Sequence, residues 1–110
     1  MSADRVIAAA VQATATVGQW PPEVVVGHLA HNDAHNWSPR IALMVNANRG
    51  ASTPPLFTWY EPQGVAQAYH GKPVEEVAAH FMAARAALVA ILRDLESSDW
   101  LATANHERFG

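Results

Sequence analysis

His28, His31 and His35 lie within a stretch of eight residues. They form the densest group of side chains in the sequence that could bind a metal. On a helix, their spacing of i, i+3 and i+7 places all three imidazoles on one stripe. Imidazole is the commonest neutral metal ligand, and a helix presents such ligands with little backbone entropy left to lose on binding. The segment is therefore a candidate metal site.

The same residues also admit a structural interpretation. A helical wheel separates the histidine stripe from a more apolar face, which is formed by Val26, Ala30, Trp37 and Met44. This separation favours solvated positions for His31 and His35, and it leaves His28 as either a ligand or a hydrogen-bonded histidine of a bundle. Asp33 falls toward the apolar side of the helix. It could orient a metal-binding histidine through a hydrogen bond, but we expect it to be an ordinary carboxylate on the helix surface.

Composition limits the classes of protein to consider. A chain of 110 residues is expected to form one domain around a single core. The absence of cysteine excludes a disulfide, a thiol nucleophile and a cysteine metal cluster, and it suits a cytoplasmic protein. The net charge is -3 and the seven Lys and Arg residues are scattered, so we expect no nucleic-acid partner. No signal peptide or membrane span can be read, which predicts a soluble protein without a membrane partner.

The first half of the chain predicts two helices. One covers residues 3–17, with Ser2 or Asp4 as its cap and its end near Gly18. The second begins at Pro21-Pro22 and extends to residue 49, where Gly50 ends it. Pro39 interrupts this segment, because a proline inside a helix removes a backbone hydrogen bond and clashes with the carbonyl four residues back. We therefore expect a kink near residues 36–38, or two helices in place of one.

The second half is also predicted to be helical. A loop over residues 50–61 leads into a short helical turn over 62–69. A long helix is expected over 73–95, with an apolar face that Arg85 interrupts, followed by a capped turn over 97–100. The apolar face consists of Val74, Val77, Phe81, Leu88, Leu92 and Leu95. Substantial helices joined by short links predict an all-α fold, an antiparallel helical bundle.

The remaining histidines and tryptophans have ordinary interpretations. His70 and His80 are expected to be exposed, the latter paired with Glu76 one turn before it. His106 beside Glu107 is either a solvated tail residue or a group that binds metal or moves a proton. The large aromatics of a small bundle are mostly core, although they could instead line a pocket; they are Trp20, Trp37, Trp59 and Trp100. No catalytic residue is assigned, because no phosphate loop, nucleophile elbow or catalytic carboxylate pair is present.

Over residues 19–110, the order of several segments resembles the DinB-like superfamily. These segments are Trp20-Pro21-Pro22-Glu23-Val24-Val25-Val26-Gly27-His28-Leu29-Ala30, Trp37-Ser38-Pro39-Arg40-Ile41, Pro54-Pro55-Leu56, Gly71-Lys72-Pro73-Val74-Glu75-Glu76-Val77 and Leu95-Glu96-Ser97-Ser98-Asp99-Trp100. The resemblance implies a four-helix bundle that binds a divalent metal, zinc or nickel, through three histidines. It makes His28, in its His-Leu-Ala context, the first ligand.

The other two ligands of the family come from a His-x-x-x-His pair on the last helix. That helix follows a segment like His106-Glu107-Arg108-Phe109-Gly110, at which this sequence ends. We therefore expect the last helix and both further ligands to be missing from this chain. Family members with known activity resemble transferases or isomerases that use a low-molecular-weight thiol such as mycothiol or bacillithiol. A metal-bound thiol ionises at neutral pH, and the thiolate is the nucleophile.

Two functions from different classes follow. The first is a metal-binding protein related to thiol-dependent transferases, which acts on a small thiol or its electrophilic partner and whose site is completed by another segment or chain. The second is a non-catalytic helical module that forms a homodimer or contacts another protein. The second function rests on the expectation that Val77, Phe81 and Leu88 form an exposed apolar surface where a fourth helix is missing.

Overall fold

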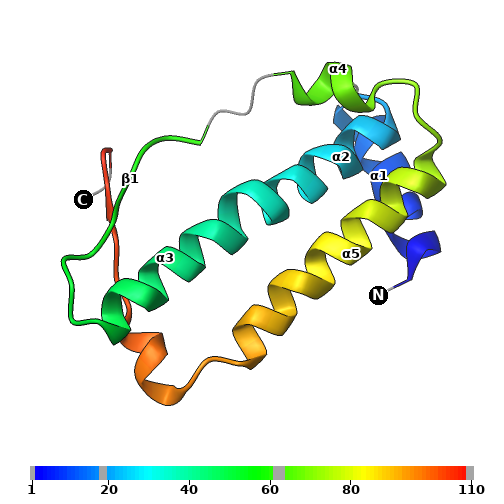
Figure 1. The fold of residues 1–110 in the computed structure, drawn as a ribbon. Helices are drawn as coiled ribbons and strands as arrows, with labels where there is room; N and C mark the ends of the chain where they lie inside the picture. The colour runs from blue at the N-terminus through cyan, green and yellow to red at the C-terminus, as the bar shows by residue number, and fades with distance from the viewer. Residues whose placement is uncertain (1, 18–19, 61–63, 109–110) are drawn as a thin grey trace.

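The computed structural model describes residues 2–17, 20–60 and 64–108, and within these ranges the chain is mostly helical (Figure 1). In chain order the elements are α1 (Ala3–Val17), α2 (Pro22–Asn32), the π-helical turn η1 (Asp33–Trp37), α3 (Ser38–Arg49), β1 (Leu56–Phe57), α4 (Val65–Tyr69), α5 (Val74–Arg93), the 3-10 turn η2 (Ser97–Leu101) and β2 (Asn105–His106). The all-α prediction is confirmed, apart from the two short strands. None of the described helices is both long enough and apolar enough to cross a membrane.

Helix α1 has the predicted bounds. The Ser2 hydroxyl accepts a hydrogen bond from the backbone N–H of Arg5 at 3.3 Å, so Ser2 is the cap. Gly18, the predicted stop, lies outside the described residues, as do the predicted start of the 62–69 turn at Pro62 and the terminal pair Phe109-Gly110. The turn itself is present as α4 from Val65 onward.

Helices α2 and α3 follow each other along one long rod in Figure 1, joined by the π turn η1. At the position of the kink or break expected before Pro39, the structure has the π turn η1, through which the helix continues without interruption. Within η1 the backbone N–H of Ser38 bonds to the carbonyl of Asp33, five residues back. This wider turn lets the chain continue past Pro39, which has no N–H and would crowd the carbonyl of His35 in a regular helix.

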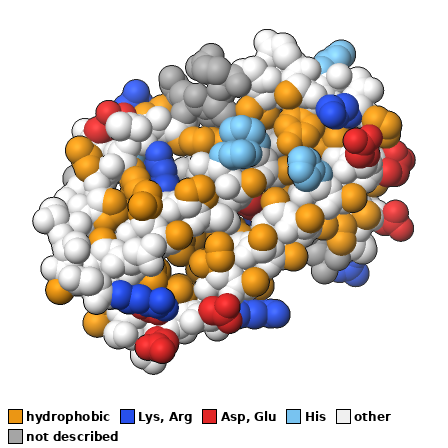
Figure 2. Space-filling view, in the orientation of Figure 1, with side chains coloured by type: hydrophobic (Ala, Val, Ile, Leu, Met, Phe, Trp, Pro, Cys, Tyr) orange, Lys and Arg blue, Asp and Glu red, His pale blue; other side chains and the backbone are white. Residues whose placement is uncertain are grey.

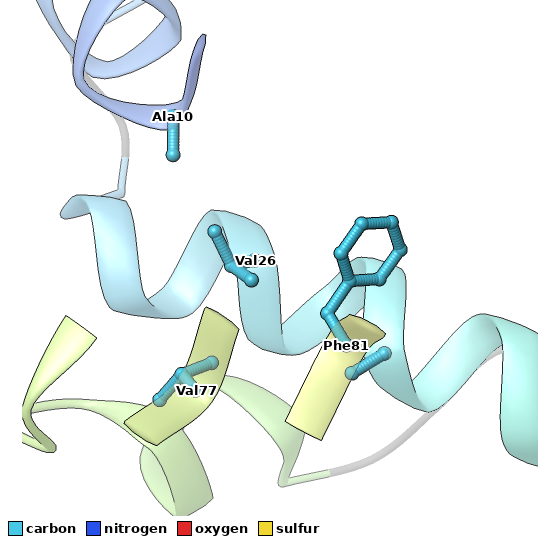
Figure 3. Close-up of a cluster of buried hydrophobic side chains, with 5 residues drawn as sticks. Ala10, Val26, Val77 and Phe81 are labelled. Atoms are coloured by element: carbon cyan, nitrogen blue, oxygen red, sulfur yellow. The ribbon is translucent and has the colours of Figure 1, made fainter. Parts of the chain in front are cut away.

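The core lies where α1, α2 and the first half of α5 meet (Figure 3). Figure 3 shows Ala10, Val26, Val77 and Phe81 converging from these three helices, and all four are at most 5% exposed. The expectation of an exposed apolar surface on α5 is wrong, because Val77, Phe81 and Leu88 are all buried. Helices α1 and α2 cover the first two of these residues without any further helix.

The two long helices run in the same direction. The carboxylate of Glu23 near the start of α2 accepts from the N–H of Gly71, just before α5, and Asp33 midway pairs with Arg85. Arg49 at the end of α3 pairs with Asp99, just after α5. This parallel pair does not follow the predicted antiparallel order. Short links favour antiparallel neighbours, whereas residues 50–73 form a long link that returns to the other end of the molecule (Figure 1).

The end of α5 is fastened to the end of α3. Arg49 donates to both carboxylate oxygens of Asp99 at 2.9 and 2.7 Å, and the side chain of Asp99 also accepts from the N–H of Glu96 at 2.8 Å. The bond from the Glu96 N–H belongs to the capping box of η2, as the capped turn over residues 97–100 predicted. The Arg49 guanidinium and the Glu96 N–H lower the pKa of Asp99 to about 2.

The crossing link and the C-terminal segment are tied together by a short parallel ladder. Leu56 pairs with Asn105 and Phe57 with His106. The Asn105 N–H donates to the carbonyl of Pro55 at 2.9 Å, and the Glu107 N–H donates to that of Phe57 at 3.0 Å. His106, for which a solvated tail position was one expectation, therefore lies with Asn105 in the strand β2.

Candidate functional site

The histidine stripe divides into a pair and a single residue. The rings of His31 and His35 lie with their centroids 4.4 Å apart, at an angle of 33°. His28 instead stacks on Trp20, with the centroids 4.1 Å apart and the planes within 7°. His28 and His31 are half-buried and His35 is exposed, so the solvated position that we expected is found for His35 and not for His31.

Burial favours the neutral form of two of these histidines. It lowers the pKa of His28 from its usual value of 6.5. For His31, burial is again the main cause of a lowered pKa, and the positive charges that His35 and His28 would carry lower it further. Neutral imidazole is the form that binds metal, so protons compete less at His31 than at an ordinary surface histidine.

Tyr60 fixes the ring of His31 from outside the helix. Its hydroxyl forms a short hydrogen bond with Nδ1 of His31, and the two rings lie 6.0 Å apart. Burial raises the pKa of Tyr60, although the positive charge of Arg40 acts in the opposite direction. With Nδ1 engaged by a neutral phenol, Nε2 of His31 is the nitrogen that remains for a ligand.

The donor set around the pair fits part of a metal site. Within the described ranges, no group of three or more His, Asp and Glu side chains is arranged to hold a metal ion. His31 and His35 can supply two nitrogen ligands, and structural or catalytic zinc sites use three or four protein ligands. The pair thus supplies only part of a metal site. His28 is the next imidazole along the stripe.

A cavity of about 640 Å³ adjoins His31 between α2, α4 and α5. Its wall combines apolar groups with a small set of polar ones, which are His31, Tyr69, Lys72, Glu76 and His80. Figure 2 shows histidine side chains gathered on this face of the molecule, with Lys, Arg and acidic side chains close by on the right. A mostly apolar cavity with a few polar groups is the usual form of a small-molecule site.

Close packing of α4 on α2 forms one side of this cavity. Gly27 is buried beneath the ring of Tyr69, and a methyl group at that position would overlap the ring atoms. Because Gly27 has no side chain, α4 can approach α2 closely at this point. The sequence contained only a weak signal for this contact, a lone Gly within an apolar helical run.

Sequence reasoning missed the role of Asp33. The residue is 1% exposed, and its two carboxylate oxygens accept from Nε and Nη2 of Arg85 at 2.6 and 3.2 Å. The expected surface carboxylate is therefore a buried ionic partner, two residues after His31 in the chain and at the start of the π turn. The signal that could have found it is Arg85, a cation on the apolar face of α5 that needs a buried acid.

The other expected positions have mixed outcomes. His70 and His80 are exposed, as predicted, and His80 lies 6.4 Å from Tyr69. His106 is half-buried with its ring 6.1 Å from that of Trp59, which contradicts a solvated tail position. The tryptophans are not core residues, because between 41% and 63% of each remains exposed. Two of them, Trp37 and Trp59, line a pocket instead.

Comparison of this chain with models of protein families, with characterised proteins and with solved structures finds no match.

Proposed function

We propose that this chain is a DinB-like helical protein that binds a divalent metal, zinc or nickel, through the stripe of His28, His31 and His35. The observation that carries the proposal is the pair of imidazoles from His31 and His35, with ring centroids 4.4 Å apart. Two histidines four residues apart on one helical face are a recurring way to hold zinc. His28 is the third candidate ligand, at one turn before His31.

The surroundings of the pair support this assignment. The hydrogen bond from Tyr60 sets the ring orientation of His31, as an outer partner does for histidine ligands in metal sites. Burial lowers the pKa of His31 and so favours the neutral, metal-binding ring at neutral pH. The half-buried position of His31 also limits the water around one ligand, while His35 leaves the pair open to solvent.

The cavity beside His31 is the proposed place for a small molecule. A divalent metal at the histidine pair would supply acidity, and a thiol bound to it would ionise at neutral pH. Lys72 and His80 would hold an anionic part of the molecule, Glu76 a cationic part, and Tyr69 and Val77 its apolar part. This arrangement is suited to a low-molecular-weight thiol or its electrophilic partner, as in thiol-dependent transferases.

Self-association is the second candidate function, and a different groove favours it. Between α1, α2 and α5 lies a depression of about 420 Å³ whose wall is almost wholly apolar, including Val6, Ala13 and Leu29. Leu29 is 44% exposed at its edge. An apolar groove with an exposed leucine suits a homodimer contact, in which a second copy covers both.

Calorimetric titration of zinc and nickel into the metal-stripped protein tests the metal proposal. We expect binding by the unaltered chain that His31→Ala or His35→Ala abolishes and His28→Ala weakens. His70→Ala is the matched control, because His70 is an exposed histidine away from the stripe. Absence of binding, or equal weakening by the control, would contradict the proposal. Light scattering on the same samples separates a dimer from a monomer.

A further inference from the structure

The groove of about 420 Å³ between α1, α2 and α5 has one charged residue in its described wall, and all the others are apolar. Its floor is formed by Ala10, Val26 and Phe81, which are at most 5% exposed (Figure 3). Its sides consist of the apolar residues Val6, Ala9, Ala13, Val25 and Leu29, together with Arg5. A cavity of this size and composition is suited to the apolar part of a small molecule.

The groove exists because α1 presents small side chains to it. Ala9, Ala10 and Ala13 lie on one face of α1, and each ends at its methyl group. No larger side chain of α1 therefore fills the space above Val26, and Leu29, at 44% exposed, flanks this space on α2. Apolar surface that the fold leaves uncovered in this way is stabilised when a hydrocarbon chain covers it.

The charged residue lies at one end of the groove. Arg5 and Ala13 are separated by about 12 Å along α1, at the usual rise of about 1.5 Å per residue of a helix. Arg5 is exposed, and arginine side chains lay their methylene stems along apolar surface while the guanidinium reaches water. The groove thus combines an apolar channel, long enough for a medium-length alkyl chain, with a cation at its mouth.

Among the residues that the structure describes, no carboxylate forms an ion pair with Arg5. The two ion pairs of these residues belong to Arg49 and Arg85. Asp4, the neighbouring acid in the sequence, is displaced by about 100° around the helix axis and does not line the groove. A guanidinium is always charged and binds carboxylates strongly, so the groove favours a ligand that carries a carboxylate beside its apolar part.

We propose that this groove binds a medium-chain monocarboxylate. The alkyl chain lies over the floor of the groove along Ala9 and Ala13, and the carboxylate faces the guanidinium of Arg5. This ligand is favoured over a second copy of the chain as the occupant, because its carboxylate supplies the partner that Arg5 lacks among the described residues. The proposal is independent of metal binding, since it uses none of the three histidines of the stripe.

Calorimetric titration of octanoate into the full chain tests this site. We expect one octanoate per chain. Octanamide, its uncharged counterpart, should bind about threefold more weakly, because an ion pair at an exposed arginine contributes little. Butanoate keeps the charge but has a shorter chain, and it should bind at least about tenfold more weakly than octanoate because it covers less apolar surface.

Ala9→Leu tests the position of the alkyl chain, because the larger side chain fills the groove. This variant should weaken octanoate binding by about tenfold or more. Ala8→Leu is the matched control, since Ala8 is exposed on the same helix but does not line the groove. It should change the affinity by less than about twofold.

Arg5→Met tests the charge separately, and circular dichroism of each variant shows that it is folded. We expect this variant to bind octanoate and octanamide with equal affinity. The proposal is overturned if octanoate gives no saturable heat, if the two alanine variants weaken binding equally, or if Arg5→Met still prefers the anion. Light scattering tests the other occupant: a dimer that Ala9→Leu dissociates and that octanoate leaves intact would show that a second copy covers the groove instead.

Discussion

The carboxylate of Asp33 accepts two hydrogen bonds from the guanidinium of Arg85, at 2.6 and 3.2 Å, in the middle of the parallel helix pair. Asp33 is 1% exposed, whereas 40% of the Arg85 side chain remains accessible. Because Asp33 begins the π turn, this ion pair fastens the turn to α5. It also lies between His31 and His35 in the chain, and so supports the segment that carries the proposed metal ligands.

Loss of Arg85 should therefore destabilise the fold more than loss of an exposed arginine. Arg85→Met leaves the buried carboxylate unpaired, and we expect the free energy of unfolding to fall by about 2 kcal/mol. Burial of only one partner keeps this value below that of a fully buried pair. Urea unfolding measures the effect, with Arg93→Met as the control on the same helix. In the double variant Asp33→Asn/Arg85→Met, part of the stability should return. An equal loss in the two single arginine variants would show that the ion pair does not stabilise the fold.

Acid should weaken the contact between the ends of α3 and α5. Arg49 and the Glu96 N–H lower the pKa of Asp99 from 3.8 to about 2 in the folded protein. A carboxyl with a lowered pKa in the folded state binds its proton more readily when unfolded. Its contribution to stability is thus complete above about pH 4 and is lost as the pH falls toward 2.

Thermal unfolding between pH 5 and pH 2 tests this expectation. The melting temperature of the unaltered protein should fall more steeply over this interval than that of Asp99→Asn, which has no carboxyl to protonate at this position. Parallel slopes for the two proteins would mean that Asp99 is not responsible for the acid sensitivity.

Packing of α4 on α2 should depend on the absence of a side chain at Gly27. A methyl group there would overlap the ring of Tyr69, so Gly27→Ala should reduce the free energy of unfolding by about 1 to 3 kcal/mol. The double variant Gly27→Ala/Tyr69→Ala removes the overlap. Its loss of stability, measured by urea unfolding, should be smaller than the sum of the losses in the two single variants. Strict additivity would contradict the proposed contact.

Local sequence signals predicted the elements well. Ser2 and Gly50 mark helix ends that the structure contains, and Pro39 follows closely after an irregular turn of the long helix. These features depend on backbone chemistry within a few residues, which a sequence displays directly. The π turn, in which the helix continues where a kink or a break was expected, was not predicted, because a π turn also depends on which side chains the wider turn directs into the core.

Long-range relations were less accessible to sequence reasoning. The parallel direction of the two long helices depends on the path of residues 50–73, which no local pattern specifies. The burial of Asp33 depends on Arg85, more than fifty residues away, and neither residue alone distinguishes a surface position from a paired one. Trp37 and Trp59 were expected in the core because large aromatics usually lie there, yet the short ladder holds them beside a cavity.

The most direct test of the metal proposal is NMR of the imidazole nitrogens during titration of zinc into the metal-stripped protein. We predict that a ring nitrogen of His31 and one of His35 show the large shifts of metal coordination, with His28 following. His70, an exposed histidine outside the stripe, should not change. Unchanged nitrogen signals from His31 and His35 at saturating zinc, or equal shifts at His70, would contradict the account.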